Sequence, residues 1–469
     1  MKDYAYAKAC TTMNIDTIVA HCTPSGSGAI ALLRISGSQA FSIVNSCAHL
    51  SSGKSLSSVE THTIHHGWVV DHNGTKLDEV LFLAMRGPRT FTGEDTIEIT
   101  GHNNQFLIET LIARIIACGA RPAQPGEFTR TAVENNKIDI LQAEAINELI
   151  HANSQQGLKH ALNQLEGSLS QQLALLEKKV LQIIGLCEAS FEFLEEDVDF
   201  SEQMREQIQE TLETIAHLKK NFDQQQLVRQ GVRIALVGTV NAGKSSLFNT
   251  LIGKNRAIVT SIAGTTRDVI EAGSYQNGMY WTFVDTAGLR NTDDIIEKEG
   301  IERSYQEAQN ADLVLLVNDA SRLLTDAEKL VYETILSSYP KKTILVHNKI
   351  DVPSLQASLR SESACLATIP VSTKTLEGIE TLHQTITKVV CEFVAKTDCP
   401  FLLNKRHMTL LTSFENKLLT VSDLLKGVIE YELVAYHLKD ALSVLTELTG
   451  KSVSEKAMDM IFRDFCIGK

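Results

Sequence analysis

The sequence predicts a multidomain protein of mixed class: an α+β N-terminal domain, a helical domain, and an α/β domain inserted into the helical one. Three observations support this. The chain has 469 residues, about three ordinary domains in length. Residues 15–120 mix short β-type runs with turn signals, whereas residues 231–390 alternate apolar strands with helices, which indicates a mostly parallel sheet. Both segments that flank residues 231–390 have helical periodicity.

We expect the N-terminal domain to cover residues 1–135 and the inserted α/β domain to cover 231–390. The two parts of the helical domain should cover 136–230 and 391–469, and the second part ends in the tail CIGK. In the first domain, β-type runs cover 17–20, 29–35, 80–84 and 96–100, and a helical pattern covers about 104–117. From residue 158 to 183, apolar residues recur at helical spacing and predict one long amphipathic helix. A second helical run follows across 202–230.

The C-terminal segment also contains a helical stripe, which Gly450 should end. This stripe consists of Leu438, Ala441, Leu445 and Leu448. Neither helical part is large enough to be stable alone, so we expect the two parts to pack together. The alternative of two separate helical segments remains open at this stage.

Composition excludes several classes of protein. A hydrophobic fraction of 43% with 22% charged residues is typical of a globular chain, and no apolar run reaches the ~18 residues of a membrane span. The first residues do not resemble a signal peptide. The nine cysteines are scattered without C-x-x-C pairs, so we expect thiols in a reducing cytoplasm. The net charge of −13 argues against nonspecific binding of nucleic acid over the whole surface.

A phosphate-binding loop is the strongest chemical signal. The apolar run 234–237 leads into Gly238-x-x-x-x-Gly243-Lys244-Ser245, and a helical pattern follows. Backbone N–H groups of such a loop surround phosphate oxygens at a helix N-terminus. Lys244 should reach the β- and γ-phosphates, and the Ser245 hydroxyl should ligate Mg²⁺.

The base is predicted from "ILVHNKID", where a strand ends in Asn348-Lys349-x-Asp351. Guanine presents two donors on one edge, and the acceptor-only carboxylate of Asp351 can pair with both. Adenine would leave that carboxylate partly unpaired, which is costly. Lys349 can lie over the face of the base. GTP is therefore the predicted nucleotide, and the α/β domain is predicted to be a Ras-like, doubly wound P-loop GTPase domain.

Three further segments complete the predicted nucleotide site. Asp285 ends a strand and can support the Mg²⁺ shell, and Gly288 can present its N–H to the γ-phosphate. A loop at 260–266 is suited to a switch in which Thr266 reaches Mg²⁺. The full predicted GTP-binding set is Asn241, Ala242, Gly243, Lys244, Ser245, Ser246, Thr260, Ser261, Ile262, Ala263, Gly264, Thr265, Thr266, Asp285, Thr286, Ala287, Gly288, Asn348, Lys349, Asp351, Ser372, Thr373 and Lys374.

Leu289 departs from the Ras pattern. Ras-like enzymes place a glutamine after this glycine to orient the attacking water, and leucine cannot make that hydrogen bond. Either hydrolysis is feeble or other groups position the water. Asn241 and the acidic run from Asp293 to Glu297 are candidates, although an acidic run is also typical of ordinary surface.

The chain resembles the MnmE (TrmE) family of tRNA-modifying GTPases almost from end to end. The resemblance rests on "FTGEDTIEITGH", "PGEFT", "DILQAEAI", "NAGKSSL", "IAGTTRDV", "DTAGLR" and the terminal "FCIGK". It implies a GTP phosphohydrolase whose N-terminal domain binds folate and forms a homodimer. It also implies an FAD-dependent partner of the MnmG/GidA type, with which the protein would form a heterotetramer, and a tRNA substrate. Together the proteins would add an aminomethyl or carboxymethylaminomethyl group at C5 of the wobble uridine.

The resemblance also implies how hydrolysis proceeds without the glutamine. G domains of the family dimerise around a K⁺ ion, for which Asn241, Thr260, Ile262 and Thr265 match the ligand positions. Glu297 matches the family's residue that helps orient water, so it is the predicted catalytic residue. A fixed cation beside the β–γ bridge stabilises developing charge.

A folate site is implied for a 5,10-methylene- or 5-formyl-tetrahydrofolate. Arg34, Glu98, Lys137 and the terminal Lys469 match its contacting positions. Two departures occur, because Ser25 and Ser27 stand in a loop that often carries a basic residue, and Thr373 replaces the usual alanine of the guanine site.

Cys466 is the fourth residue from the end, the position of the cysteine in a prenylation box, but Gly468 and Lys469 do not fit that box. Ser452-x-x-Glu455 reads as a capping box that opens a last helix. Its apolar face, Met458, Ile461, Phe462 and Phe465, should anchor the tail. Cys466 is a candidate catalytic thiol, since a nearby cation can lower a thiol pKa. An idle thiol is the alternative.

Two other functions share the nucleotide motifs. A ribosome-assembly GTPase of the Era type would need a basic RNA-binding module, which this acidic chain does not offer. A pure signalling switch would leave the N-terminal domain and the tail without a role.

Overall fold

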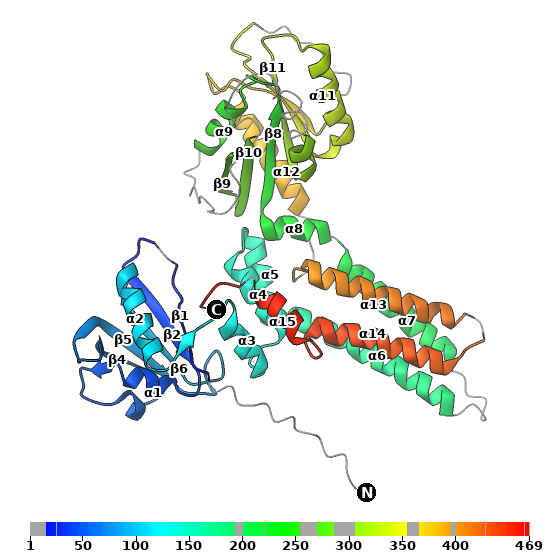
Figure 1. Cartoon of the computed structure of the whole chain (residues 1–469). Coiled ribbons are helices and arrows are strands. Elements are labelled where there is room, and N and C mark those ends of the chain that lie inside the picture. Colours follow the sequence, from blue (N-terminus) through cyan, green and yellow to red (C-terminus); the bar gives the residue numbers. More distant parts are fainter. Residues whose placement is uncertain are drawn as a thin grey trace. The chain divides into compact units, whose positions relative to one another are not determined.

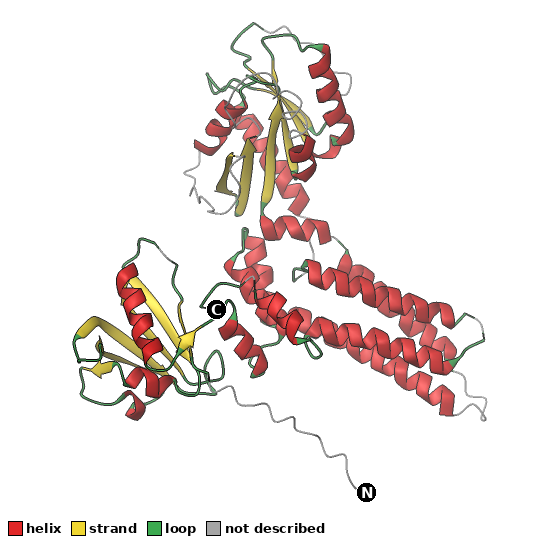
Figure 2. Ribbon diagram, viewed as in Figure 1, coloured by secondary structure: helices red, strands yellow, loops and turns green. Residues whose placement is uncertain are grey.

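The computed structural model describes residues 16–24, 26–192, 200–220, 222–253, 270–285, 305–353, 365–394, 400–426, 428–463 and 465–468. The chain divides into two compact units, residues 1–147 with 442–469 and residues 148–441. Figures 1 and 2 show the three kinds of structure that the sequence predicts: a mixed α+β part, a helical part and an α/β part. The predicted fold class is confirmed.

The sheet of the first unit has, in its described part, the strand order β3-β4-β5-β6-β2-β1-β7. Its strands are β1 (Ile18–His21), β2 (Ile30–Ser36), β3 (Ala48–Leu50), β4 (Thr63–Val70), β5 (Lys76–Met85), β6 (Thr96–His102) and β7 (Arg121–Pro122). All neighbours pair antiparallel except β1 and β7, which are parallel. The alternating buried residues of β2, β5 and β6 form one apolar cluster with two helices, so these helices cover a single face.

The described helices and 3-10 turn that lie wholly within this unit are α1 (Ala40–Asn45), η1 (Leu56–Ser58), α2 (Gln105–Ala117), α3 (Glu127–Glu134) and α15 (Glu455–Phe462). Asn104 caps α2 by accepting hydrogen bonds from the backbone N–H groups of Phe106 and Leu107. The four predicted strands and the predicted helix near 104–117 are confirmed, whereas β3, β4 and α1 were not predicted.

The sheet of the second unit has the described order β13-β12-β11-β8-β10-β9. Its strands are β8 (Val232–Gly238), β9 (Ile270–Gln276), β10 (Met279–Asp285), β11 (Leu313–Asp319), β12 (Thr343–Asn348) and β13 (Ala367–Pro370). Only β9 runs antiparallel to its neighbour. Residues of β8 alternate between two apolar clusters, which shows that both faces of the sheet are covered. This is the doubly wound arrangement.

Helices α9 (Lys244–Gly253), α11 (Asp326–Ser338) and α12 (Ile379–Val394), with the turn η3 (Pro340–Lys342), accompany this sheet. The remaining helices are α4 (Ile140–Ile150), α5 (Gln155–Leu165), α6 (Ser168–Glu192), α7 (Ser201–Lys219), α8 (Phe222–Gln230), α13 (Lys405–Leu424) and α14 (Tyr431–Thr449). Among the described residues, no helix is both long and apolar enough to cross a membrane.

The two helical parts of the chain pack together, as predicted. Helix α7 from the first part packs against α13 from the second, and Cys187 of α6 donates a hydrogen bond to the carbonyl of Tyr431 in α14. The Lys219–Glu415 ion pair also joins the two parts. The α/β segment is therefore inserted in a helical domain.

The single long helix predicted across 158–183 is wrong. Helix α5 ends at Leu165 and α6 begins at Ser168, and Gly167 between them has a φ of 93° that a continued helix does not allow. The predicted leucine stripe also fails on α5, because Leu158 and Leu162 are each 44% exposed. Its buried face consists of Gly157, His160, Ala161 and Gln164 instead.

Candidate active site

The phosphate loop begins where β8 ends and stops where α9 begins. Two of its glycines are required by close approach of neighbouring chain. A Cβ at Gly238 would overlap the carbonyl oxygen of Val317, and a Cβ at Gly243 would overlap the side-chain amide of Asn348. Asn241 adopts a left-handed φ of 61°, which asparagine tolerates better than most residues. The loop therefore has the shape that exposes successive backbone N–H groups.

Lys244 closes this loop upon itself. Its Nζ donates to the carbonyl oxygens of Gly238 and Thr239, both at 2.8 Å. The side chain is buried, and burial lowers the pKa of its ammonium, which the carboxylate of Asp285 opposes. A phosphate group offers a charged acceptor that neutral carbonyls do not, so Lys244 can exchange these partners for phosphate oxygens.

Ser245, a predicted magnesium ligand, and Asp285, predicted to support the magnesium shell, come together. The Ser245 hydroxyl donates to Oδ2 of Asp285 at 2.7 Å, and Asp285 is buried at the end of β10. A hydroxyl and a carboxylate side by side at a phosphate loop fit Mg²⁺, which prefers oxygen ligands. Ser246, the next residue of α9, is exposed.

Asn348 joins three of the predicted nucleotide segments. Its Nδ2 donates to the carbonyl of Ala242 at 2.9 Å, and its Oδ1 accepts from the backbone N–H of Thr373 at 3.3 Å. Thr373 makes this contact through its backbone, so the alanine that it replaces would make the same bond. The phosphate loop, the base-reading strand end and the 372–374 segment are thus held together by one buried side chain.

Asp351 is presented as a carboxylate. The Ser372 hydroxyl donates to its Oδ1 at 2.7 Å, and this hydrogen bond lowers the pKa of the Asp351 carboxyl. Ser372 Oγ also accepts the backbone N–H of Lys374 at 3.3 Å. An exposed, ionised acceptor at this edge suits the paired donors of guanine.

Lys349 forms an ion pair that the sequence did not predict. Its Nζ forms an ion pair with Oδ2 of Asp319 at 2.6 Å. Burial alone would raise the pKa of Asp319, but hydrogen bonds from Lys349 and Ser321 hold this pKa below its ordinary value. The Lys349 ammonium is thereby fixed by the end of β11, beside the strand that carries Asn348.

A hydroxyl brace behind the phosphate loop escaped sequence analysis. The hydroxyl of Tyr332 donates to the carbonyl of Val317 at 2.5 Å and accepts the backbone N–H of Thr239 at 3.1 Å. Arg322 donates to Thr239 Oγ1 at 3.3 Å while forming a two-point ion pair with Glu328. No local sequence pattern connects Tyr332 of α11 with a loop more than 90 positions away.

Several predicted residues lie outside the described residues. They are Thr260, Ser261, Ile262, Ala263, Gly264, Thr265, Thr266, Thr286, Ala287, Gly288, Glu297 and Lys469. The predictions for the switch loop, for three of the four K⁺ ligands and for catalytic Glu297 therefore stay predictions.

A second site lies in the other unit, where Arg34 and Glu98 face one another from β2 and β6. Arg34 Nη2 and Glu98 Oε1 are 2.8 Å apart, and both side chains are 16% exposed. The Arg34 guanidinium lies 5.8 Å from the ring centre of Phe91 and 5.6 Å from that of Phe128. Planar aromatic and guanidinium groups beside a carboxylate fit a flat, charged heterocyclic ligand.

The C-terminal tail reaches this second site. Arg34 Nη1 donates to the carbonyl of Gly468 at 3.4 Å, and Gly126 N donates to the carbonyl of Cys466 at 3.4 Å. Gly468 lies against Cys22, since a Cβ on it would be 3.0 Å from Cys22 Sγ. Phe462 and Phe465 are buried in a cluster with Met458, so the predicted anchoring of the tail is confirmed. Cys466 itself is exposed.

One detail near the second site differs from expectation. The N-cap of α15 is Ser454, whose side chain accepts from Ala457 N, and Ser452 instead bonds Thr446. The last helix thus starts two residues later than the predicted capping box places it. Lys137 is exposed and donates to the carbonyl of Pro88 at 2.8 Å, which places it beside the loop that carries Phe91.

Comparison with known proteins matches nearly the whole chain. A family model for the MnmE helical domain matches residues 140–466, and one for the GTP-binding protein TrmE N-terminus matches residues 17–137. A protein of Chlamydia trachomatis serovar A named tRNA modification GTPase MnmE is 38% identical over 462 residues, covering 97% of this chain and 99% of its own. The chain belongs to the MnmE family.

Other MnmE relatives agree in length as well as in name. The tRNA modification GTPase MnmE of Streptococcus mutans is 36% identical and covers 98% of this chain and 100% of its own. That of Lachnoclostridium phytofermentans is 35% identical, with 97% and 100% covered. Among solved structures, the G domain of the T. maritima FeoB iron transporter matches 34% of this chain and 98% of its own at 30% identity and a TM-score of 0.26. Since that score is low, the assignment to the MnmE family rests on the sequence matches.

Proposed function

We propose that this chain is the GTP-hydrolysing member of a two-protein system that modifies C5 of the wobble uridine in certain tRNAs. The observation that carries the proposal is identity of 35–38% to tRNA modification GTPases over 97% of the chain. The contact of the tail with Arg34 supports it, because a signalling switch would not need a tail beside the Arg34–Glu98 ion pair. Those relatives favour modification over the ribosome-assembly alternative.

The nucleotide chemistry follows from residues of the α/β domain. The loop N–H groups and Lys244 bind the phosphates, and Asp351 selects guanine. Ser245 and Thr266 would hold Mg²⁺, with Asp285 supporting its outer shell, while Asn241, Thr260, Ile262 and Thr265 would hold K⁺. These cations supply positive charge where negative charge develops on the phosphates. Glu297 orients the attacking water, which Leu289 cannot do.

The one-carbon chemistry belongs to the N-terminal domain, residues 1–135. Arg34, Lys137 and Lys469 suit the carboxylates of a tetrahydrofolate, and Glu98 suits the amino edge of its pterin. Cys466 directly follows the buried Phe465, so its thiol is held near this site. We assign Cys466 the role of a nucleophile or proton carrier.

The assembly that we propose is a homodimer through the N-terminal domain, joined by an FAD-dependent partner into a heterotetramer. The G domain, residues 231–390, dimerises transiently across its switch loops around K⁺. The helical parts, residues 136–230 and 391–469, connect the two kinds of site.

The decisive test is the tRNA of cells that lack this protein. Mass spectrometry of nucleosides should show loss of the aminomethyl-type group at the wobble uridine, restored by the wild-type gene. Intact modification together with immature ribosomal RNA would contradict the proposal and favour ribosome assembly.

The proposed hydrolysis site is tested with purified full-length protein. K⁺ should accelerate GTP hydrolysis relative to Na⁺, because Asn241 and the sequence of the 260–266 loop resemble a K⁺ site. Glu297→Ala should bind GTP normally but lose turnover. Equal rates in both salts would remove the K⁺ site, and wild-type turnover of the variant would remove Glu297 from catalysis.

A further inference from the structure

Two cysteines that are far apart in the sequence meet inside the first unit. Cys47 joins the end of α1 to β3, and Cys118 is the C-cap of α2. Both are free thiols, and their side chains form a hydrogen bond with one another. Cys47 is fully buried in the apolar cluster of this unit, and Cys118 packs against the same cluster while it stays partly exposed.

This thiol pair is separate from the site around Arg34. The apolar cluster contains Leu33 and Ile35 of β2, which lie on either side of Arg34 in the sequence. Because successive side chains of a strand point to opposite faces, Arg34 lies on the face of the sheet that the cluster does not cover. The two thiols therefore belong to the layer of α1 and α2 on the other face.

Arg114 fixes the end of α2 to the chain around Cys47. It lies four residues before Cys118, on the same face of the helix. Its Nε donates to the carbonyl of Val70 at 3.1 Å, and its Nη2 donates to the carbonyl of Ser46 at 3.4 Å. The backbone N–H of Val70 donates in turn to the carbonyl of Cys47 at 2.8 Å. The last turn of α2 is thus tied both to the residue before Cys47 and to the strand that pairs with it.

Gly119 gives a second contact between the same two segments. A Cβ on this residue would lie 3.8 Å from Cδ1 of Ile43, which is ordinary van der Waals distance. The residue after Cys118 therefore packs against α1, one turn before Cys47. The Cys47 thiol itself lies 3.4 Å from the carbonyl oxygen of Val44. The two thiols are held together by packed helix ends.

A thiol pair in this arrangement needs only a small movement to become a disulfide, in which the sulfur atoms are about 2.05 Å apart. Burial raises the pKa of the Cys47 thiol above its ordinary value, the neighbouring thiol of Cys118 raises it further, and the guanidinium of Arg114 opposes both. Since the thiolate is the reactive form, Cys47 by itself is a poor nucleophile. An oxidant therefore reacts first with Cys118, whose side chain reaches the solvent.

We propose that Cys47 and Cys118 form a reversible thiol–disulfide pair that reacts with hydroperoxides. The sulfur of Cys118 attacks one oxygen of hydrogen peroxide, the O–O bond breaks, and a sulfenic acid and one water molecule result. The sulfur of Cys47 then attacks the sulfur of Cys118, and the hydroxyl group leaves with the Cys47 proton as a second water molecule. Two thiols and one peroxide thus give one disulfide and two water molecules.

The disulfide would be reversible, because a small thiol can attack the partly exposed Cys118 sulfur and release Cys47. While it lasts, the bond joins the ends of α1 and α2 across a long stretch of chain. Such a cross-link restricts the unfolded chain, so it stabilises the first unit against unfolding under oxidising conditions.

The test uses the reduced full-length protein and hydrogen peroxide. The reaction is stopped with acid, the protein is denatured and alkylated with N-ethylmaleimide, and its peptides are mapped by mass spectrometry without reductant. We expect one pair of peptides joined through Cys47 and Cys118, with both thiols lost together and both recovered after treatment with dithiothreitol.

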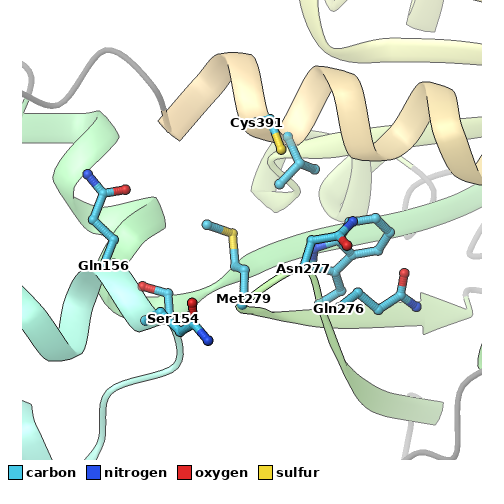
Figure 3. Close-up of a pocket in the computed structure, with 10 residues that line it drawn as sticks. Ser154, Gln156, Gln276, Asn277, Met279 and Cys391 are labelled. Atoms are coloured by element: carbon cyan, nitrogen blue, oxygen red, sulfur yellow. The ribbon is translucent and has the colours of Figure 1, made fainter.

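Two other cysteines are matched controls. Cys391 is exposed on α12, and the pocket that it lines contains no second cysteine (Figure 3). It should be oxidised to a sulfenic acid that dimedone traps, without an internal cross-link, and it shows that the oxidant acted. Cys187 is buried like Cys47, and burial raises the pKa of its thiol to about 11. It should stay reduced.

Two variants test the order of the steps. In Cys118→Ser, loss of the Cys47 thiol should be at least about tenfold slower than in the wild type, because a buried thiol is inert without its exposed partner. In Cys47→Ser, Cys118 should accumulate as a sulfenic acid that dimedone traps. Should a variant not fold, the cross-linked peptide of the wild type is itself decisive. Absence of that peptide while Cys391 is oxidised, or loss of the Cys47 thiol at the wild-type rate in Cys118→Ser, would overturn the proposal.

Discussion

Replacement of Gly126 by alanine should displace the C-terminal tail. Gly126 precedes α3 with a left-handed φ of 68°, and its N–H donates to the carbonyl of Cys466. A Cβ on this residue would be 2.8 Å from the carbonyl oxygen of Phe462 and 2.9 Å from Cβ of Phe465. The substitution therefore presses directly on the segment that holds the tail.

The magnitude follows from two costs. A non-glycine residue in left-handed conformation costs about 1–2 kcal/mol, and relief of the overlap requires the facing chain to move away. Removing both phenylalanines from the core would cost roughly 3–6 kcal/mol, since a buried phenylalanine is worth about 1.5–3 kcal/mol. The two phenylalanines should therefore remain buried but shift away from residue 126, and residues 466–468 should move with them and lose their contacts with Cys22 and Arg34.

Hydrogen exchange followed by mass spectrometry measures this displacement. The C-terminal peptide of Gly126→Ala should exchange at least about tenfold faster than that of the wild type, which corresponds to about 1.4 kcal/mol. Binding of 5-formyltetrahydrofolate, measured by calorimetry, should weaken by a similar factor, while GTP hydrolysis without tRNA should not change. Gly185→Ala is the matched control, because nothing lies within 4 Å of a Cβ at that helical position. Unaltered exchange in Gly126→Ala would refute the docking geometry, whatever the folate result.

Two further predictions concern the α/β domain. Tyr332→Phe removes one hydroxyl and leaves the N–H of Thr239 and the carbonyl of Val317 without that partner. Because each orphaned group costs about 1–3 kcal/mol, the affinity for a fluorescent GTP analogue should fall about tenfold. Wild-type affinity would show that the brace does not shape the loop. For Glu328, the hydrogen bond from Arg322 lowers the pKa to about 2 from its ordinary 4.5. Its ionised form therefore stabilises the fold above pH 4.5, and that contribution is lost as the pH falls through about 2. Glu328→Gln should lower the urea midpoint at pH 7, and the gap from the wild type should close between pH 4.5 and 2; a gap independent of pH would contradict this origin.

Local pattern was sufficient for the nucleotide motifs and for most element types. Strand, glycine loop and helix follow one another within 231–253, so adjacent residues carry the whole signal. Pattern was insufficient at Gly167. Leucine spacing continues through this residue as though the helix did, and periodicity does not record that the chain turns there. The exposed Leu158 shows the same limit, since spacing cannot tell which face of α5 the neighbouring α8 covers.

The sequence by itself determined the fold class, the GTP chemistry and the family, because each depends on residue types at short spacing or on matches along the chain. Only the tertiary structure decided which distant groups meet. It brought Gly468 to Arg34, 434 positions away, by burying Phe465, and it set Tyr332 against the phosphate loop. These contacts arise from packing of separate elements, whose energies depend on shape and burial and therefore leave no local pattern in the sequence.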